Sequence, residues 1–294
     1  MASWLIIGIS GVTCGGKTSL AVQLKSLLTK YFLSQKCVVA ISTISQDDYF
    51  LKADDPRHVY LPSLDHNNWE LPTAVDLDAM YKTSQDIISV KNDETQPEGK
   101  HDFKKKLLGI LLIEGFLVLN HKPTRSLCHM SYYLVLSRAI CLSRRLCRSY
   151  DPPDVPGYFE DCVWPEHVYR RAEIFGKGKL VDYSDPLCMN ELSQCLQIAD
   201  SIISTNKNPE QHDPSRESSL ETVVTQKEKL GVKTDSDLFM RIGGNVLPLE
   251  GFGKAGLGIV DGIRILNGGV IGKEELAELV FKDVLHEIER LNFG

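Results

Sequence analysis

The residues with the clearest chemical potential form a glycine-rich segment near the start of the chain, Gly11-Val12-Thr13-Cys14-Gly15-Gly16-Lys17-Thr18. Its glycines allow successive backbone N–H groups to turn toward phosphate oxygens. Lys17 can reach the β and γ phosphates of a nucleotide, and the Thr18 hydroxyl can bind Mg²⁺. An ordinary glycine turn is the alternative, which the position between a strand and a helix disfavours. We expect this segment to bind ATP through Gly11, Val12, Thr13, Cys14, Gly15, Gly16, Lys17, Thr18 and Ser19.

A pair of acidic residues lies in the segment Ser45-Gln46-Asp47-Asp48-Tyr49-Phe50. This segment follows an expected strand, so its carboxylates lie at the carboxyl edge of the sheet, where open α/β folds bind ligands. Phosphoryl transfer needs a group that orients the acceptor hydroxyl and accepts its proton. Asp47 is our candidate for this base. The alternative is that Asp47 or Asp48 caps a turn or a helix.

Another carboxylate, Glu114, ends the apolar run Leu-Leu-Ile-Glu. At the end of a strand beside the phosphate loop it can hold Mg²⁺ directly or through water. A solvated glutamate at a strand end is the alternative.

Three arginines, Arg144, Arg145 and Arg148, lie within about one helical turn of one another. The guanidinium fork suits phosphate and carboxylate groups, so these residues could form a mobile lid over ATP. Taken alone, three arginines on a helix are more often a solvated face.

The elements that position these residues follow from the hydrophobic pattern. Short apolar runs predict buried parallel strands, and apolar residues at helical spacing after Lys17 predict a helix to about Tyr31. The expected strands are residues 4–9, 38–42, 108–113 and 132–136. Their alternation with helical stretches indicates an α/β fold with a doubly wound parallel sheet.

Later in the chain, residues 138–149 and 274–291 are expected to be helical. Residues 205–236 are polar and lack aromatics, so we interpret them as a disordered insertion. The glycine-rich stretch 243–272 is expected to be loop or turn rather than a second nucleotide site.

The composition limits the classes of function. With 294 residues, of which 43% are hydrophobic, the chain is long enough for one domain carrying an insertion. Its net charge of -6 argues against nucleic acid as a partner. The eight cysteines form no CxxC pair, which indicates reduced thiols and a cytoplasmic protein. We expect neither a signal peptide nor a membrane span, since the apolar run 107–119 is too short and contains Glu114.

Several motifs occur together in one order. They are Ile7-Gly8-Ile9-Ser10-Gly11-Val12-Thr13, Gly16-Lys17-Thr18, Ile44-Ser45-Gln46-Asp47-Asp48-Tyr49-Phe50, Ile113-Glu114-Gly115-Phe116, Tyr150-Asp151-Pro152-Pro153-Asp154-Val155-Pro156-Gly157-Tyr158-Phe159 and Val163-Trp164-Pro165. With these motifs the chain resembles the nicotinamide riboside kinase family, a relative of the uridine kinases. The resemblance covers residues 4–173 and returns more weakly at 263–291.

This resemblance implies a P-loop nucleoside-kinase fold with five parallel strands and a helical lid. It also implies transfer of phosphate from ATP, with Mg²⁺, to the 5′-hydroxyl of nicotinamide riboside or nicotinic acid riboside, a step that feeds NAD synthesis. Asp47, Lys17 and Glu114 would be catalytic, with Mg²⁺ bound by Thr18, Asp47 and Glu114. Arg144 and Arg148 would hold ATP phosphates. The implied substrate-binding residues are Asp47, Asp48, Tyr49, Phe50, Trp69, Glu70, Arg145, Tyr150, Asp151 and Asp154.

The base of the substrate would lie between Trp69 and Tyr150, because a pyridinium gains a cation–π interaction of about 0.5 to 2 kcal/mol from aromatic faces. The family usually has Tyr-Asp where this chain has Trp69-Glu70, and the surrounding residues also resemble uridine kinases. A uridine or cytidine kinase is therefore the alternative within enzymes. A nucleotide-binding interaction protein with impaired catalysis is the alternative outside them. A second departure is an insertion at about 175–262, and the oligomeric state is open.

Overall fold

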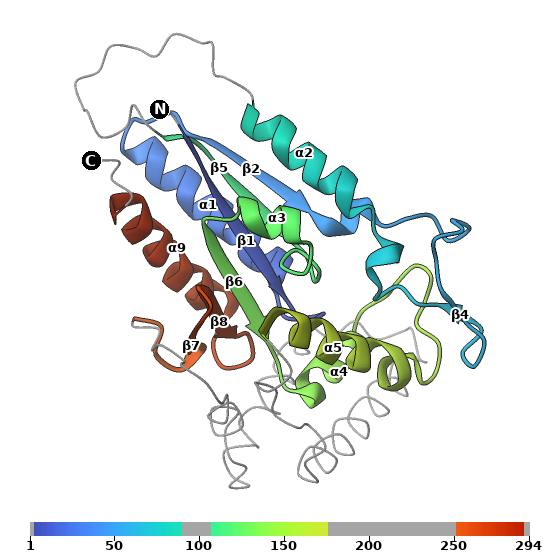
Figure 1. Cartoon of the computed structure of the whole chain (residues 1–294). Helices are drawn as coiled ribbons and strands as arrows, with labels where there is room; N and C mark the ends of the chain where they lie inside the picture. The colour runs from blue at the N-terminus through green and yellow to red at the C-terminus, as the bar shows by residue number, and fades with distance from the viewer. Residues whose placement is uncertain (1–2, 90–106, 176–250, 291–294) are drawn as a thin grey trace, which may run out of the picture.

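The sheet at the centre of the molecule has six strands in the order β2-β5-β1-β6-β8-β7 (Figure 1). The computed structural model describes residues 3–89, 107–175 and 251–290. The parallel strands are β1 (Ser3–Gly11), β2 (Ala40–Ser45), β5 (Leu107–Glu114), β6 (Met130–Val135) and β8 (Ile263–Asn267). The edge strand β7 (Gly256–Val260) pairs antiparallel with β8. The expected α/β fold with five parallel strands is confirmed, and the antiparallel sixth strand is an addition.

Helices cover both faces of the sheet, as Figure 1 shows. They are α1 (Lys17–Ser34), α2 (Leu77–Ser89), α3 (Lys122–Leu127), α4 (Arg138–Leu146), α5 (Trp164–Phe175) and α9 (Lys273–Arg290). The central strands are apolar on both faces because each face is buried. On one face they pack against α1 and α9, and on the other against α2 and the end of α5.

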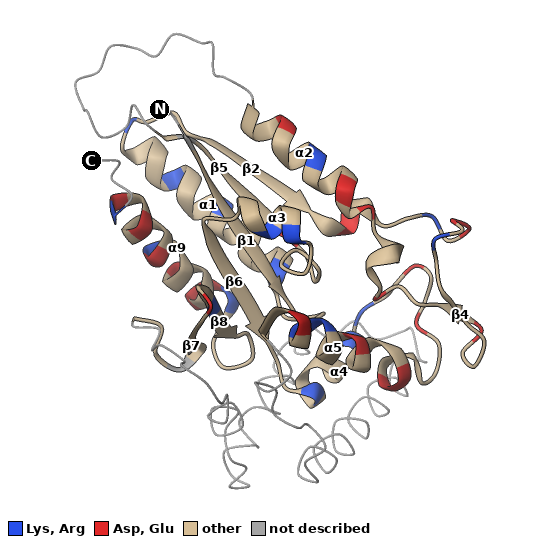
Figure 2. Cartoon of the chain, in the orientation of Figure 1, with Lys and Arg blue, Asp and Glu red and all other residues tan. Residues whose placement is uncertain are grey.

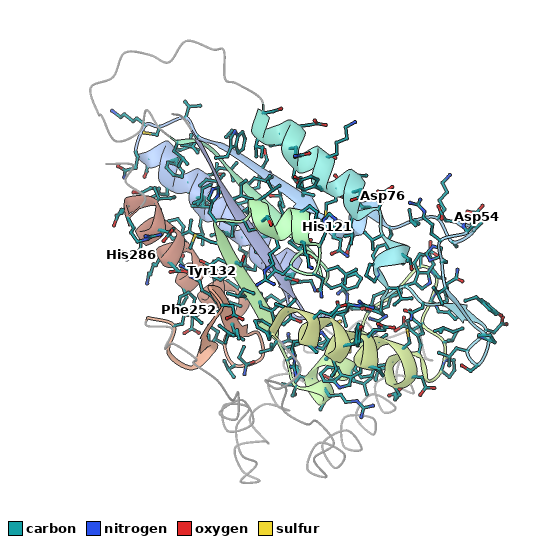
Figure 3. All side chains as sticks on the ribbon, viewed as in Figure 1. Asp54, Asp76, His121, Tyr132, Phe252 and His286 are labelled. Carbon is teal, nitrogen blue, oxygen red and sulfur yellow. The ribbon has the colours of Figure 1, made fainter. Side chains whose placement is uncertain are left out.

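A buried polar contact ties α9 to the sheet. The Tyr132 hydroxyl, labelled in Figure 3, donates to Asp283 on α9 at 2.6 Å. Arg264 of β8 pairs with the same carboxylate at 2.6 Å. The Tyr132 hydroxyl and the Arg264 cation together satisfy a carboxylate that is only 16% exposed, as a charge removed from water requires.

The shorter elements lie mainly beside the carboxyl edge of the sheet. They are the 3-10 helices η1 (Gln46–Tyr49), η2 (Pro72–Ala74) and η7 (Gly253–Ala255), the π-helix η4 (Phe159–Val163), and the two-residue strands β3 (Tyr60–Leu61) and β4 (His66–Asn67). None of the helices in residues 3–89, 107–175 and 251–290 is long and apolar enough to span a membrane.

Several element boundaries differ from the sequence expectations. The strand expected at 38–42 is found at Ala40–Ser45, and Val38 is 92% exposed. This shift brings Ser45 level with Glu114 on the neighbouring strand. The helix expected at 138–149 ends at Leu146, and the helix expected to end near Tyr31 continues to Ser34. The hydrophobic pattern shows where an element lies, but capping and tertiary contacts decide at which residues it begins and ends.

The interpretation of residues 243–272 as loop is wrong for the part that the structure describes. Residues 256–260 and 263–267 form the β7–β8 hairpin, joined by Asp261 and Gly262. Both linking residues have positive φ, 51° and 77°, as a two-residue hairpin turn of this kind requires. The end of the expected 175–262 insertion is therefore part of the sheet. The predicted disorder at 205–236 lies outside the described residues.

The helix that follows the glycine-rich loop should be a major source of stability. Leu24 of α1 is fully buried in the core, whereas Val22 two residues earlier is 61% exposed. We predict that Leu24→Ala lowers the free energy of unfolding by about 2 to 5 kcal/mol, because it leaves a cavity. Val22→Ala should change it by less than about 0.5 kcal/mol. Denaturant titration of both variants measures this, and equal losses would contradict the packing described.

Candidate active site

The glycine-rich loop runs from the end of β1 to the start of α1. A Cβ atom at Gly11 would lie 2.1 Å from the Leu134 carbonyl oxygen, so this position accepts only glycine. Gly16, with φ of 92°, precedes the first turn of α1. Lys17 is partly buried and donates to the Val12 carbonyl oxygen at 2.8 Å. The Gly15 N–H donates to the same Val12 oxygen at 3.1 Å, so the loop is closed on itself in this structure. Its position between a strand and a helix N-terminus is the one that phosphate-binding loops use.

Two hydroxyl groups meet one carboxylate at the edge of the sheet. Glu114 is only 2% exposed, and its Oε1 accepts hydrogen bonds from Thr18 at 3.1 Å and Ser45 at 2.6 Å. Parallel pairing of β2 with β5 brings Ser45 beside Glu114. Thr18 and Glu114, both predicted as magnesium ligands, are thus in direct contact, and their metal role stays a prediction. Ser45 was not predicted as a site residue, although it precedes Asp47 by two positions in the Ile44–Phe50 motif.

The acidic pair lies on η1, immediately after β2. Asp47 and Asp48 are both exposed, while Gln46 between them and the strand is fully buried and accepts from the Leu117 N–H at 2.8 Å. The buried Gln46 fixes η1 against the turn that follows β5. Asp47 therefore stands at the same sheet edge as Glu114, open to a ligand.

The residues at this edge suit Mg²⁺, because Thr18 and Glu114 offer hard oxygen atoms in direct contact and Mg²⁺ uses few protein ligands. The described residues contain no cluster of three or more His, Cys, Asp or Glu side chains. A site of this type takes its remaining ligands from water and phosphate oxygens.

The arginines of α4 and of the turn that follows it contact the glycine-rich loop. Arg144 donates to the carbonyl oxygens of Cys14 at 3.2 Å and Gly268 at 3.1 Å, which joins the loop to the turn after β8. Arg148 lies 3.9 Å from the Cys14 sulfur. The helix α4, which bears Arg144 and Arg145, therefore packs directly on the loop, while Arg148, two residues beyond its end, is exposed.

Arg145 is the most buried of the three, with 6% exposure. It pairs with both oxygens of Asp154 at 2.5 and 2.9 Å, approaches Glu70 at 3.4 Å and donates to the Thr13 hydroxyl at 3.3 Å. Its guanidinium carbon lies 4.4 Å from the centre of the Tyr150 ring. Burial alone would lower its pKa, but Asp154 and Glu70 raise it, so the group stays charged.

Glu70 is nearly enclosed, and burial raises the pKa of its carboxyl to about 7. Arg145 opposes this shift, while the negative charges of Asp154 and Glu166 add to it. Glu70 thus changes charge close to neutral pH.

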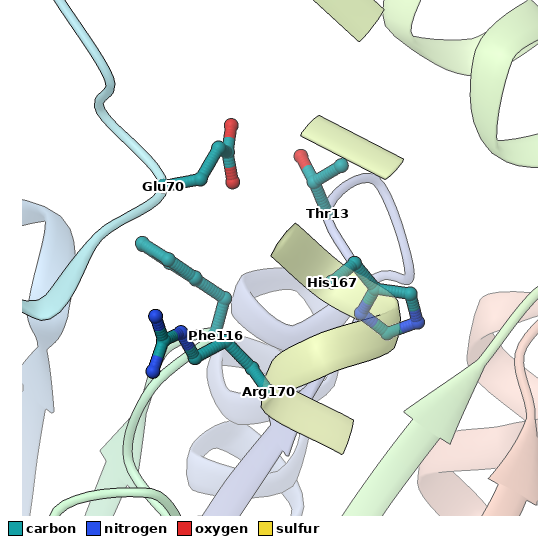
Figure 4. Close-up of a pocket in the computed structure, with 5 residues that line it drawn as sticks. All are labelled: Thr13, Glu70, Phe116, His167 and Arg170. Carbon is teal, nitrogen blue, oxygen red and sulfur yellow. The ribbon is translucent and has the colours of Figure 1, made fainter. Parts of the chain in front are cut away.

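A small pocket lies beside Glu70 (Figure 4). It is lined by Thr13, Glu70, Phe116, His167 and Arg170. The lining residues come from the glycine-rich loop, the loop that carries Glu70, the turn after β5, and α5. The helix α5 carries acidic and basic residues together (Figure 2). Thr13 was predicted to bind ATP rather than to line this side of the site, and Phe116, His167 and Arg170 were not predicted as site residues. Phe116 had a signal in the Ile-Glu-Gly-Phe motif, whereas the two α5 residues had none.

The two aromatic residues expected to hold the base have different neighbours. Trp69 packs on His58, with ring centres 4.4 Å apart, and meets Phe50 edge-on at 6.0 Å. Tyr150 packs on Arg145, and its hydroxyl lies 3.4 Å from the Cys14 sulfur. The Trp69–Tyr150 sandwich remains a prediction, as do substrate contacts of Asp48, Tyr49 and Asp151.

The chain is similar to known kinases. Residues 6–152, half of the 294-residue chain, match the phosphoribulokinase/uridine kinase family. Human nicotinamide riboside kinase 1 is 34% identical over 58% of this chain and 77% of its own length. Human nicotinamide riboside kinase 2 is 34% identical over 64% of this chain and 76% of its own length. The uridine kinase of Tolumonas auensis is 26% identical over 49% of this chain and 67% of its own length.

The raised pKa of Glu70 makes a prediction about stability. Its folded value of about 7 lies above its ordinary value of 4.5, so the folded protein binds the proton more tightly than the unfolded chain does. The contribution of Glu70 to stability is therefore lost as pH rises from about 4.5 to about 7. We predict that Glu70→Gln becomes more stable relative to the parent protein by roughly 1 to 3 kcal/mol between pH 5 and pH 8.

Denaturant titrations of both proteins across this pH range measure the difference. The exposed Glu278 of α9 provides the control substitution Glu278→Gln. A difference for Glu70→Gln that stays constant with pH would show that Glu70 is ionised throughout.

Proposed function

The chain belongs to the phosphoribulokinase/uridine kinase family, within which it is a kinase of the nicotinamide riboside kinase type, and we propose that it phosphorylates the 5′-hydroxyl of nicotinamide riboside. The phosphate donor of such kinases is ATP. The product would be the mononucleotide, a precursor in NAD synthesis. Nicotinic acid riboside has the same ribose and is a further candidate acceptor.

The observation that carries this proposal is the contact set of Arg145. This one guanidinium touches Thr13 of the phosphate-binding loop and two carboxylates, Glu70 and Asp154. A carboxylate oxygen can accept from a ribose diol, and Arg145 can donate to its oxygen atoms. The acceptor nucleoside would therefore lie directly beside the loop that holds the donor phosphates. In-line transfer requires such an arrangement.

In the proposed reaction Asp47 orients the 5′-hydroxyl and accepts its proton as the bond from this oxygen to the γ-phosphorus of ATP forms. The bond from the γ-phosphorus to the β–γ bridging oxygen breaks at the same time, and ADP leaves. Exposure of Asp47 at the sheet edge leaves it free to meet this hydroxyl. Lys17, released from the Val12 carbonyl, would bind the β and γ phosphates, while Arg144 and Arg148 stabilise the charge on the transferred group.

Thr18 and Glu114, with Asp47, would hold Mg²⁺, which when bound neutralises charge on the β and γ phosphates. The hydrogen bonds from Thr18 and Ser45 keep the Glu114 carboxylate in one orientation. Ser45 thus has a supporting role in the metal site.

The pyridinium base gives a physical reason for preferring nicotinamide riboside. Trp69 and Tyr150 offer aromatic faces, and a cationic ring gains about 0.5 to 2 kcal/mol that neutral uracil cannot. Phe50 and Phe116 extend the aromatic surface, with ring centres 6.1 Å apart.

Cytoplasmic action is part of the proposal because the described cysteines 14, 37, 128, 141, 147 and 162 are free.

A substrate panel tests the proposal. With ATP and Mg²⁺, we predict that kcat/KM for nicotinamide riboside exceeds that for uridine and cytidine by about twofold to 30-fold, the size expected from a cation–π difference of about 0.5 to 2 kcal/mol. Nicotinic acid riboside belongs in the same panel. A clear preference for uridine would contradict the proposed acceptor and favour the uridine kinase alternative.

The assignment of the base is tested separately. We predict that Asp47→Asn lowers kcat about 100-fold or more while the Kd for ATP stays nearly constant, because the amide cannot accept the proton. Single-turnover kinetics and ATP titration measure the two quantities. Asp54→Asn, in an exposed position labelled in Figure 3, is the matched control. Turnover of Asp47→Asn close to that of the control would refute the role of Asp47.

A further inference from the structure

Residues 68–70, which carry the proposed ribose-binding Glu70, are held by one side of a helical stretch. The Trp69 N–H donates to the Tyr158 hydroxyl at 2.9 Å, and the Cys162 thiol donates to the Asn68 side-chain oxygen at 3.1 Å. The Asn68 amide in turn donates to Glu166 at 3.2 Å. Every residue of this short segment is therefore tied, directly or through its neighbour, to the same helical stretch.

The three helical partners are spaced by four residues, and they follow one face through the π-helical turn η4 into α5. π-helical turns are rare and occur often at functional sites. Here the wider turn lies under Cys162, the middle of the three contacts. It keeps Tyr158, Cys162 and Glu166 in a row against residues 68–70.

Asn68 passes this constraint to Glu70. Its side-chain oxygen accepts from the Glu70 N–H at 3.0 Å as well as from Cys162. With its amide donating to Glu166 and only 5% of the residue exposed, Asn68 has one orientation that satisfies all of its partners. The backbone of Glu70 is thereby fixed, and its carboxylate reaches Arg145 from that position.

Glu166 is itself anchored. Its second oxygen accepts from Arg170 at 3.3 Å, and Arg170 pairs with Glu173 at 3.0 Å. Asn120, in the turn after β5, donates to both the Arg170 carbonyl oxygen at 2.8 Å and Glu173 at 3.0 Å. A continuous chain of hydrogen bonds thus runs from the turn after β5 through α5 and Asn68 to the Glu70 backbone.

We propose that Asn68 and Glu166 are positioning residues for the acceptor nucleoside, which hold Glu70 where its carboxylate receives the ribose 2′- and 3′-hydroxyls. The inference rests on the proposed function and deepens it. It makes selectivity for ribose over 2′-deoxyribose depend on two residues that do not touch the substrate. A site built to hydrogen-bond a hydroxyl rejects the analogue that lacks it, because the site's own polar groups are then left unpaired.

The test compares steady-state constants for nicotinamide riboside and its 2′-deoxy analogue in Asn68→Ala, Glu166→Ala and the double variant. Each single change should raise KM for the riboside about fivefold or more and leave KM for ATP within about twofold. Each should also reduce the preference for the riboside over its deoxy analogue. Because both act through one chain, the double variant should be no worse than the worse single variant.

Two further variants separate positioning from general damage. Glu166→Gln keeps an oxygen that can accept from Asn68, so it should restore most of the selectivity lost in Glu166→Ala. Glu160→Ala, in the same helical stretch, should leave all constants unchanged. If Asn68→Ala does not fold, Glu166→Ala and Glu166→Gln suffice, because the Glu166 side chain is 22% exposed.

Three results would each overturn the positioning role while leaving the proposed function intact. They are equal rises in KM for the riboside and for ATP, an unchanged preference for the riboside over its deoxy analogue, and effects of the two single changes that multiply in the double variant. Failure of the parent protein to phosphorylate the riboside, with turnover of uridine, would overturn the proposed function. In that case the same ratio measured with uridine and 2′-deoxyuridine decides the positioning role.

Discussion

A single buried guanidinium connects the parts of the site that must act together. Arg145 is 6% exposed and bonds to Asp154, with further contacts to Glu70 and to Thr13 of the phosphate-binding loop. A charge removed from water is tolerated only when it is well paired, and removal of one partner of such a pair costs about 3 to 5 kcal/mol. The pairing therefore fixes the distance between the loop that holds phosphates and the carboxylates that would hold a ribose.

The sheet sets the other half of the geometry. β1, β2 and β5 are adjacent and parallel, so the phosphate-binding loop, Ser45 and Glu114 all emerge at one edge. This juxtaposition brings the hydroxyls of Thr18 and Ser45 onto one carboxylate. The arrangement of groups at this edge follows from strand order, whereas the proposed ribose contacts come from α4 and the loop that carries Glu70.

The sequence was sufficient for what local patterns encode. Apolar runs located the strands, and the glycine spacing together with Glu114 located the phosphate edge. The sequence was not sufficient to predict contacts between segments that are far apart in the chain. Asn68 and Glu166 are 98 positions apart, and no pattern in either segment predicts their hydrogen bond. The hairpin at 256–267 was missed because its glycines are typical of loops, although Asp261-Gly262 is a strong turn signal.

The most direct measurement is a crystal structure of the protein with nicotinamide riboside, Mg²⁺ and a non-hydrolysable ATP analogue. We expect oxygen atoms of Glu70 and nitrogen atoms of Arg145 within about 3.2 Å of the ribose hydroxyls. The 5′-hydroxyl should lie beside Asp47, with the base against Trp69. A ribose bound away from Glu70 and Arg145, with its 5′-hydroxyl far from Asp47, would contradict this arrangement.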